Sequence, residues 1–332
     1  MKILGIETSC DDTATALVEA KRGRFTVMRE RRSSQIDLHK QYGGIVPEVA
    51  ARAHAELVMP LVEEALDGEQ PDVIAVTAGP GLITALMVGV QTAATLSYAW
   101  NVPLVAVNHI EGHVYGNWLA SKKNIAFPAL ALIVSGGHTE LILMRDHGNY
   151  KLIGKTRDDA AGECFDKVGK LLGFEYPGGP KISEAAKGGN PAAIAFPRPM
   201  IHSDDYDFSF AGLKTAALYW LREHKRYSIA DVSASFEQAI VDVLVAKTIR
   251  AAKEYKPKSV MLGGGVAANT KLRAALAASV STDYPEGALT LPPLFATVDN
   301  APMIAVAGYF HAKRKDFTSW KKITADPNWR IA

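Results

Sequence analysis

Residues 129–144 read ALALIVSGGHTELILM, an apolar run, a turn of small and polar residues, and a second apolar run. Strand-forming residues on both sides of a glycine-containing turn predict a strand over Ala129–Val134 and a returning strand over Glu140–Met144. Gly136 and Gly137 would let backbone N–H groups in the turn approach an anion closely. The stretch therefore predicts a strand–turn–strand unit whose turn can hold a charged ligand.

The same pattern occurs at the start of the chain. Lys2–Ile6 predicts a strand and Ala14–Val18 a returning strand, with the polar turn TSCDDT between them. Ser9 in this turn corresponds to Ser135 in the other. Two such units about a domain length apart predict a duplicated α/β architecture, with the two turns facing each other across a cleft.

Helices and strands alternate between these two units. Periodic apolar residues predict helices over Pro47–Leu66 and Leu82–Trp100, and short apolar runs predict strands over Asp72–Thr77 and Val102–Val107. In open α/β sheets, ligands bind at the carboxyl ends of the strands. The last of these strands therefore delivers the next segment, beginning at His109, to a ligand-binding edge.

That segment, residues 108–113, reads NHIEGH. On a helix, His109 and His113 would project from one face, one turn apart, and could bind one metal ion. A third ligand must come from elsewhere in the chain. Asp299 is a candidate, because it is a carboxylate at the start of the helix predicted over Ala301–Arg314; the alternative is that it caps that helix.

A metallopeptidase is the first alternative reading of the histidine pair. Zinc proteases of the H-E-x-x-H type place the general-base glutamate directly after the first histidine. Here that position is Ile110, and Glu111 stands one residue later, about 100° further around a helix. The spacing is compatible with a metal site and argues against peptidase chemistry.

The second half of the chain supplies further candidate ligand-binding segments. A helix is predicted over Ala160–Leu172 and an irregular loop over Tyr176–Pro180. A strand over Ser259–Leu262 ends in three glycines, and the following Asn269 is either a helix cap or a hydrogen-bond partner for a ligand. The mixed segment 207–214 receives no assignment.

The bulk composition is that of an ordinary globular protein. The 332 residues are enough for two domains; 48% are apolar, 22% are charged, and the formal net charge is +2. Basic clusters at residues 21–24, 29–32, 222–226 and 313–315 are solvated faces or parts of a tRNA-facing surface. Two cysteines exclude a disulfide framework. With no signal peptide or membrane span evident, we expect a cytoplasmic protein without a membrane partner.

Taken together, these motifs resemble those of the tRNA threonylcarbamoyltransferases, including the bacterial, archaeal and mitochondrial members once called O-sialoglycoprotein endopeptidases. The resemblance runs nearly end to end, with the motifs in the family's order. They are Gly5–Thr13, His39–Pro47, His109–His113, Ser135–Thr139, Tyr176–Pro180, Asp207–Lys214, Gly263–Asn269 and Asp299–Asn300.

The resemblance implies an α/β, two-lobed fold shared with actin, hexokinase and heat-shock ATPases, with duplicated βαβ-type domains around a central nucleotide cleft. The first lobe would comprise residues 1–127, completed by a C-terminal helix in 302–332, and the second residues 128–301. The implied reaction transfers the threonylcarbamoyl group from threonylcarbamoyl-adenylate to N6 of adenosine 37, in tRNAs that read codons starting with A.

The resemblance also implies specific site residues. One divalent metal per subunit, Fe(II) with zinc as the alternative, would be held by His109, His113 and Asp299. Eight residues would bind the adenylate: Val134, Ser135, Gly136, Gly137, His138, Asp166, Gly179 and Asn269. Some relatives carry an acid where this chain has Ser183, so a substrate contact there stays open. The general base also stays open among Glu7, Asp11, Asp12 and His138.

Partners follow from the same resemblance. Besides tRNA and threonylcarbamoyl-adenylate, bacterial relatives use a smaller paralogue of the same fold and a P-loop ATPase, whereas mitochondrial ones act as homodimers. A non-catalytic nucleotide-binding subunit or a sugar-kinase-like ATPase is the second alternative, because the fold alone hosts such functions. A degenerate paralogue should lack the two histidines and the aspartate, which this chain keeps.

Overall fold

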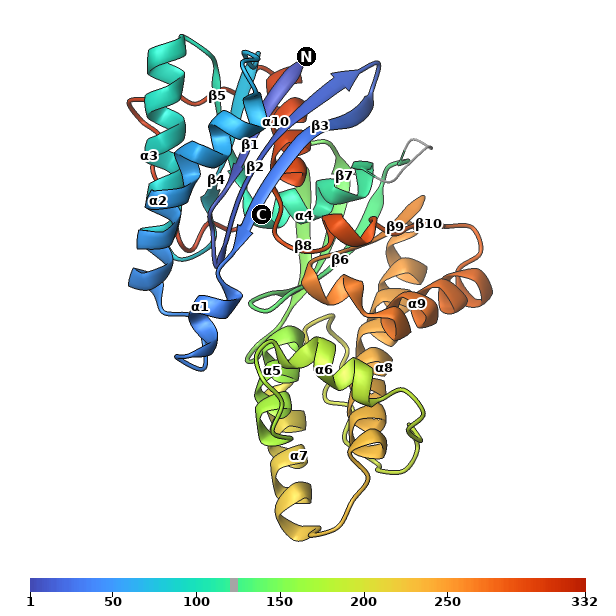
Figure 1. The fold of residues 1–332 in the computed structure, drawn as a ribbon. Helices are drawn as coiled ribbons and strands as arrows, with labels where there is room; N and C mark the ends of the chain where they lie inside the picture. Colours follow the sequence, from blue (N-terminus) through green and yellow to red (C-terminus); the bar gives the residue numbers. More distant parts are fainter. Residues whose placement is uncertain (120–124) are drawn as a thin grey trace. The chain divides into compact units, whose positions relative to one another are not determined.

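A computed structural model describes residues 1–119 and 125–332 (Figure 1). The chain divides into two compact units, Met1–Asn124 with Pro292–Ala332, and Ile125–Leu291. Residues 292–301, which the sequence analysis assigns to the second lobe, belong to the first unit. Asp299 therefore lies in the same unit as His109 and His113.

The first unit contains a five-stranded mixed sheet of order β3-β2-β1-β4-β5. β1 pairs antiparallel with β2, with which it forms a hairpin, and parallel with β4. β4 pairs parallel with β5, and a helix connects these two strands. The strands are β1 (Lys2–Glu7), β2 (Asp12–Lys21), β3 (Arg24–Ser34), β4 (Val73–Gly79) and β5 (Leu104–Asn108).

The second unit repeats this topology. Its sheet has the order β8-β7-β6-β9-β10, and β6 pairs antiparallel with β7 and parallel with β9. The strands are β6 (Ala129–Val134), β7 (Thr139–Asp146), β8 (Asn149–Lys155), β9 (Ser259–Gly263) and β10 (Ala288–Thr290). The duplicated α/β architecture predicted from the two hairpins is therefore confirmed.

Successive residues of β1 point to opposite faces of the first sheet, and different helices cover the two faces. Leu4 and Ile6 pack in a cluster with residues of α2 (Pro47–Leu66) and α3 (Ile83–Trp100). Gly5 points to the opposite face, where a Cβ atom would lie 2.3 Å from the carbonyl oxygen of Ala301, at the start of α10 (Ala301–Lys313). Glycine at this position lets α10 approach the sheet closely, which fixes the segment just before it.

Helices of the second unit enclose one hydrophobic core around β6, β7 and β9. The longest, α8, is buried along most of its length. The helices are α5 (Ala161–Leu171), α6 (Gly178–Ala185), α7 (Ala211–Glu223), α8 (Ile229–Tyr255) and α9 (Thr270–Asp283); the first unit adds α1 (Ile36–Lys40) and α4 (His109–Tyr115), and short 3₁₀ turns are η1 (Gly116–Leu119), η2 (Gly265–Ala268) and η3 (Leu294–Ala296).

The structure corrects one predicted segment. The prediction of an irregular loop over Tyr176–Pro180 is wrong in its second half, because α6 begins at Gly178. The carboxylate of Asp166 accepts hydrogen bonds from the first N–H groups of this helix and so stabilises a glycine-rich start. Within the described residues, none of the helices combines the length and apolar character needed to cross a membrane.

Candidate functional site

β5 leads directly into the short helix α4, and the junction orients both histidines. The side chain of Asn108 caps α4 by accepting hydrogen bonds from the backbone N–H groups of Ile110 and Glu111. His109 and His113 lie one turn apart on this helix, with ring centroids 4.6 Å apart, and both are almost completely buried. The segment is thus helical, which is the condition under which the spacing predicts a shared face for the pair.

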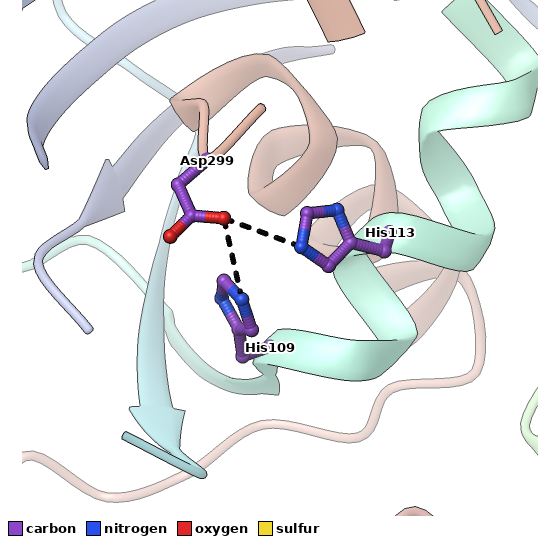
Figure 2. A group of neighbouring side chains, drawn as sticks. All are labelled: His109, His113 and Asp299. Carbon is purple, nitrogen blue, oxygen red and sulfur yellow. Dashed lines mark ion pairs between the residues drawn. The ribbon is translucent and has the colours of Figure 1, made fainter. Parts of the chain in front are cut away.

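Asp299 comes from the other end of the sequence and lies against the two imidazoles. Its Oδ1 atom is 3.2 Å from Nε2 of His113 and 3.5 Å from Nε2 of His109 (Figure 2). Asp299 does not cap α10, because the neighbouring Asn300 accepts the hydrogen bond from Met303 N. One potential ligand atom from each of the three side chains lies within 4.8 Å of the other two.

A buried carboxylate orients the first histidine. Oε2 of Glu7, at the end of β1, lies 3.2 Å from Nδ1 of His109 and also accepts a 2.6 Å hydrogen bond from Oγ1 of Thr77. The other oxygen of Glu7 accepts a hydrogen bond from the backbone N–H of Ser9. Such a carboxylate behind a histidine fixes the tautomer and directs the second ring nitrogen, here Nε2, toward the site.

The electrostatics fit a bound cation. Burial disfavours a charged His109, but the carboxylates of Asp299 and Glu7 outweigh this effect and raise the pKa of His109 to about 9. Burial lowers the pKa of His113, although Asp299 opposes this effect. Nε2 of His113 faces Oδ1 of Asp299 at 3.2 Å, whereas its Nδ1 is buried without a hydrogen-bond partner among the described residues. A neutral imidazole beside a carboxylate is a suitable metal ligand. Two imidazoles and one carboxylate suit Fe(II) or zinc.

Glu111 is not placed as the general base of a peptidase. Its carboxylate is buried and lies 2.8 Å from Nε2 of His311 on α10. His311 in turn contacts Asp316 through Nδ1, also at 2.8 Å. Glu111 therefore joins α4 to α10, the two helices on whose positions the histidines and Asp299 depend. This pairing explains why an acid stands between the two histidines.

The four candidate bases have different surroundings. Glu7 is fully buried, and its two oxygens accept hydrogen bonds from Ser9 and Thr77, so its role is to orient His109. Burial and the charge of Asp299 raise the pKa of Asp12 to about 7, and its buried Oδ1 has no hydrogen-bond partner in the described part of the chain. Burial also raises the pKa of Asp11. His138 lies in the second unit, in the turn between β6 and β7.

That turn is held by two short hydrogen bonds. Ser135 N donates to the carbonyl of His138, and His138 N donates to Oγ of Ser135. Gly136 and Gly137 are exposed, and a Cβ atom on either would meet nothing within 4 Å. Neither glycine is therefore required by packing within the protein. The open backbone leaves room for a ligand at the turn.

Two further glycines bring other elements against the same turn. Gly162, at the start of α5, donates its N–H to the carbonyl of Ser135. Gly264, with φ of 87°, sits so close to Val134 that a Cβ atom would lie 2.4 Å from the carbonyl oxygen of that residue. The helix that carries Asp166 and the loop that leads to Asn269 are thereby anchored beside β6.

Asp166 and Asn269 each stabilise the N-terminus of a helix. Asp166 Oδ1 lies 2.8 Å and 3.2 Å from the N atoms of Gly178 and Gly179. Asn269 caps α9 through its oxygen, and its Nδ2 donates to Ser183 on α6 and to Glu237 on α8. The N-cap reading of Asn269 is thus confirmed. Glu237 is buried and was missed, since nothing in the α8 sequence distinguishes it from a surface acid.

The structure also explains the unassigned segment 207–214. Asp158 accepts hydrogen bonds from the backbone N–H groups of Phe210 and Ala211 and so caps α7. Asp159 binds the ammonium groups of Lys167 on α5 and Lys214 on α7. The two acids join α7 to the helix that carries Asp166. Sequence reasoning missed this network because its partners lie about 50 residues apart.

The fold has relatives among solved structures. The crystal structure of T.kodakarensis HypF superposes with a TM-score of 0.62 over 94% of this chain and 47% of that chain. The Clostridium difficile activator of 2-hydroxyisocaproyl-CoA dehydratase, solved with bound ADPNP, superposes with a TM-score of 0.55 over 95% of this chain and 97% of that chain. Each is 14% identical in sequence. These similarities and the duplicated sheets define the class: an α/β protein of the actin, hexokinase and heat-shock ATPase fold, with a His–His–Asp group in its first unit.

Sequence comparison gives the family. The sequence model of the tRNA N6-adenosine threonylcarbamoyltransferases (TsaD) matches residues 26–306. A protein of that name from Anaeromyxobacter dehalogenans (strain 2CP-C) is 49% identical, covering 99% of each chain, and one from Bacillus subtilis (strain 168) is 51% identical, covering 93% of this chain and 90% of its own. The chain belongs to the tRNA N6-adenosine threonylcarbamoyltransferase family.

Proposed function

We propose that this protein transfers the threonylcarbamoyl group from threonylcarbamoyl-adenylate to N6 of adenosine 37, in tRNAs that read codons starting with A. As a member of its family the protein is a transferase. This donor and this acceptor are supported by the near full-length match to threonylcarbamoyltransferases from two bacteria. Because tRNA is the acceptor, we place the reaction in the cytoplasm.

The donor is a mixed anhydride, so no covalent intermediate on the protein is required. N6 of the adenosine attacks the carbamoyl carbon, the new N–C bond forms, and the bond from that carbon to the phosphate oxygen breaks. AMP leaves with the electron pair, and the amine loses a proton to a base. The adenosine amine is a weak nucleophile, so accurate positioning of donor and acceptor supplies much of the rate.

His109, His113 and Asp299 are the residues proposed to hold a divalent metal, iron in the first instance and zinc as the alternative. Such an ion supplies Lewis-acid stabilisation of the negative charge that develops on the phosphate of AMP. Glu7 orients His109, and the Glu111–His311 pair holds α4 beside α10. The proposal is supported by the distances from Oδ1 of Asp299 to Nε2 of His113 and to Nε2 of His109, 3.2 Å and 3.5 Å.

The adenylate is proposed to bind at the turn Val134–His138 together with Asp166, Gly179 and Asn269. The exposed glycines of the turn offer backbone N–H groups to the anion without a side chain in the way. Asp166 and Asn269 would shape this site as helix caps, and any direct contact with the nucleotide would use their remaining hydrogen-bonding capacity. Ser183 would act through Asn269.

Asp12 is the general base that we favour. Its Oδ1 is buried and has no hydrogen-bond partner among the described residues, so this oxygen is placed to accept a proton. Glu7 does not suit the role, because its oxygens already accept hydrogen bonds from Thr77 and Ser9.

We further propose that a smaller paralogue of the same fold and a P-loop ATPase assist the reaction. Three exposed apolar side chains on α3 support a protein partner: Ile83, Met87 and Tyr98 are 42%, 49% and 65% exposed. Residues three, four or eleven apart recur on one side of a helix.

The test is transfer itself. The purified protein would be incubated with threonylcarbamoyl-adenylate and an unmodified tRNA that reads an A-starting codon, and the digested tRNA examined by mass spectrometry. Formation of N6-threonylcarbamoyladenosine by the protein alone, or after the two partner proteins are added, supports the proposal. Absence of product with both partners present contradicts it.

A further inference from the structure

Two basic segments that are far apart in the sequence lie together in the first unit. Residues 21–24, KRGR, form the turn between β2 and β3. The next residue, Phe25, packs its ring 5.2 Å from Tyr309 and 5.7 Å from Phe310 on α10. Lys313 and Arg314 follow these two aromatic residues by one helical turn and therefore occupy the same sides of α10. The turn and the end of α10 thus form one basic surface.

The cations of this basic surface are exposed and, in the described part of the chain, unpaired. Lys21, Arg22, Arg24, Lys313, Arg314 and Lys315 are all exposed. Among the described residues, none of their side chains forms an ion pair or a hydrogen bond. Arg29 and Arg31 on β3 differ, because they pair with Glu69 and Glu64. Unpaired cations gathered from two segments raise the local potential and attract an anionic partner.

β3 connects this basic surface to the region of the candidate metal site. The edge strand extends about 27 Å from Arg24 to Arg32. Arg32 lines a hollow of about 200 Å³ with Glu30 and Phe295. Phe295 lies on η3, four residues before Asp299, and is 47% exposed although it is aromatic. The exposed side chains of Arg32 and Phe295 therefore line the same hollow, and Phe295 belongs to the segment that leads to Asp299.

We propose that these residues form a tRNA-binding track in the first unit. The cations Lys21, Arg22, Arg24, Arg32, Lys313, Arg314 and Lys315 would contact phosphates, and Phe295 would stack on an unpaired base next to the modified adenosine. The inference rests on the proposed function, since it takes the polyanion to be the tRNA acceptor.

Exposed cations together with an exposed aromatic ring suit the binding of single-stranded RNA. Proteins recognise loop nucleotides by stacking splayed bases on aromatic side chains, and they hold the backbone with lysine and arginine. Two carboxylates near the track would repel RNA phosphates: Glu30 lines the hollow, and Asp316 follows Lys315 in the sequence. Asp316 lies 2.8 Å from Nδ1 of His311, and Glu30 lines the hollow together with Arg32, so each carboxylate has a neighbouring group that can offset its charge.

The test measures tRNA affinity against salt concentration by fluorescence anisotropy, with the full chain and a labelled unmodified tRNA. The variants are Arg22→Gln with Arg24→Gln, and Lys313→Gln with Arg314→Gln and Lys315→Gln. The matched control is Arg222→Gln with Lys225→Gln and Arg226→Gln, which removes three exposed cations from the second unit. Each variant of the track should weaken binding roughly ten-fold and flatten the slope of log affinity against log salt by about one per lost phosphate contact.

The outcomes separate specific contacts from general charge. A control that weakens binding as much as the track variants overturns the proposal, as do track variants that bind tRNA like wild type, even if they lose affinity for a partner protein. A wild-type chain that does not bind tRNA also overturns it. If the slope changes as expected but no modified nucleoside forms, the track stands and the proposed function fails.

Phe295 provides a second, uncharged test. Phe295→Ala should weaken tRNA binding roughly ten-fold with an unchanged salt slope, because a stacking contact releases no counterions. Phe295→Tyr keeps an aromatic ring and should restore the affinity. Equal binding by Phe295→Ala and wild type would remove the ring from the track.

Discussion

Oε2 of Glu7 lies 3.2 Å from Nδ1 of His109, so the last residue of β1 orients the first residue of α4. If this carboxylate sets the histidine for metal binding, Glu7→Gln should weaken metal binding 10- to 100-fold with the fold retained. Chelator competition would measure the affinity, with Glu56→Gln on the exposed side of α2 as the control. An unchanged affinity in Glu7→Gln would show that His109 needs no such support.

The pairing of Glu111 with His311 should appear as coupling between two helices. Because a buried, charge-assisted hydrogen bond is lost, Glu111→Gln and His311→Gln should each reduce the free energy of unfolding by about 1.5–3 kcal/mol. The double variant should lose less than the sum of the two, as urea denaturation of all four proteins would reveal. Additive losses would mean that the two side chains act independently. A Glu111→Gln variant of normal stability with greatly reduced kcat would instead favour a catalytic role.

Asp166 holds the N-terminus of α6 and so connects stability to donor binding. Asp166→Ala removes the acceptor for two N–H groups and should cost about 0.5–2 kcal/mol of stability. If α6 helps to form the adenylate site, the same variant should raise KM for the donor more than it lowers kcat. Asp231→Ala, near the start of α8, is a helix-terminal control. A normal donor KM in Asp166→Ala would separate α6 from donor binding.

Glu140 on β7 should make stability depend on pH. Burial raises the pKa of Glu140 from an ordinary 4.5 to about 7, although Lys155 opposes the shift. The folded state therefore binds this proton more tightly than the unfolded state, and stability should fall as pH rises from about 4.5 to 7, then level off. The loss is at most about 3 kcal/mol. Urea denaturation between pH 4.5 and 8 should show a smaller decline for Glu140→Gln than for wild type; equal declines would contradict the assignment.

The repeated hairpins allowed the fold to be predicted, because alternating burial and turn chemistry are local properties of the sequence. β3 was not predicted, since four of its residues are arginines. Its place at the edge of the sheet, where charged side chains reach solvent, is a tertiary fact that the sequence pattern does not contain. The same limit hid α6, whose glycine-rich start depends on a carboxylate of α5.

The candidate site divides in the same way. The spacing of His109 and His113 predicted a shared helix face. Asp299 was a candidate ligand because it lies just before the helix that begins at Ala301. Their supporting residues could not be found this way, because Glu7 lies 102 positions from His109 in the chain, and Glu111 and His311 lie 200 positions from each other. An acid between two histidines is uninformative until its partner on α10 is seen.

Metal occupancy measured together with transfer tests the central claim most directly. Wild type and the double variant His109→Ala with His113→Ala would be loaded anaerobically with Fe(II), analysed for metal by mass spectrometry, and assayed for N6-threonylcarbamoyladenosine with the partner proteins present. We predict about one ion per wild-type chain, none in the variant, and product in proportion to the metal bound. Full occupancy of the double variant, or undiminished transfer by metal-free protein, would contradict the account.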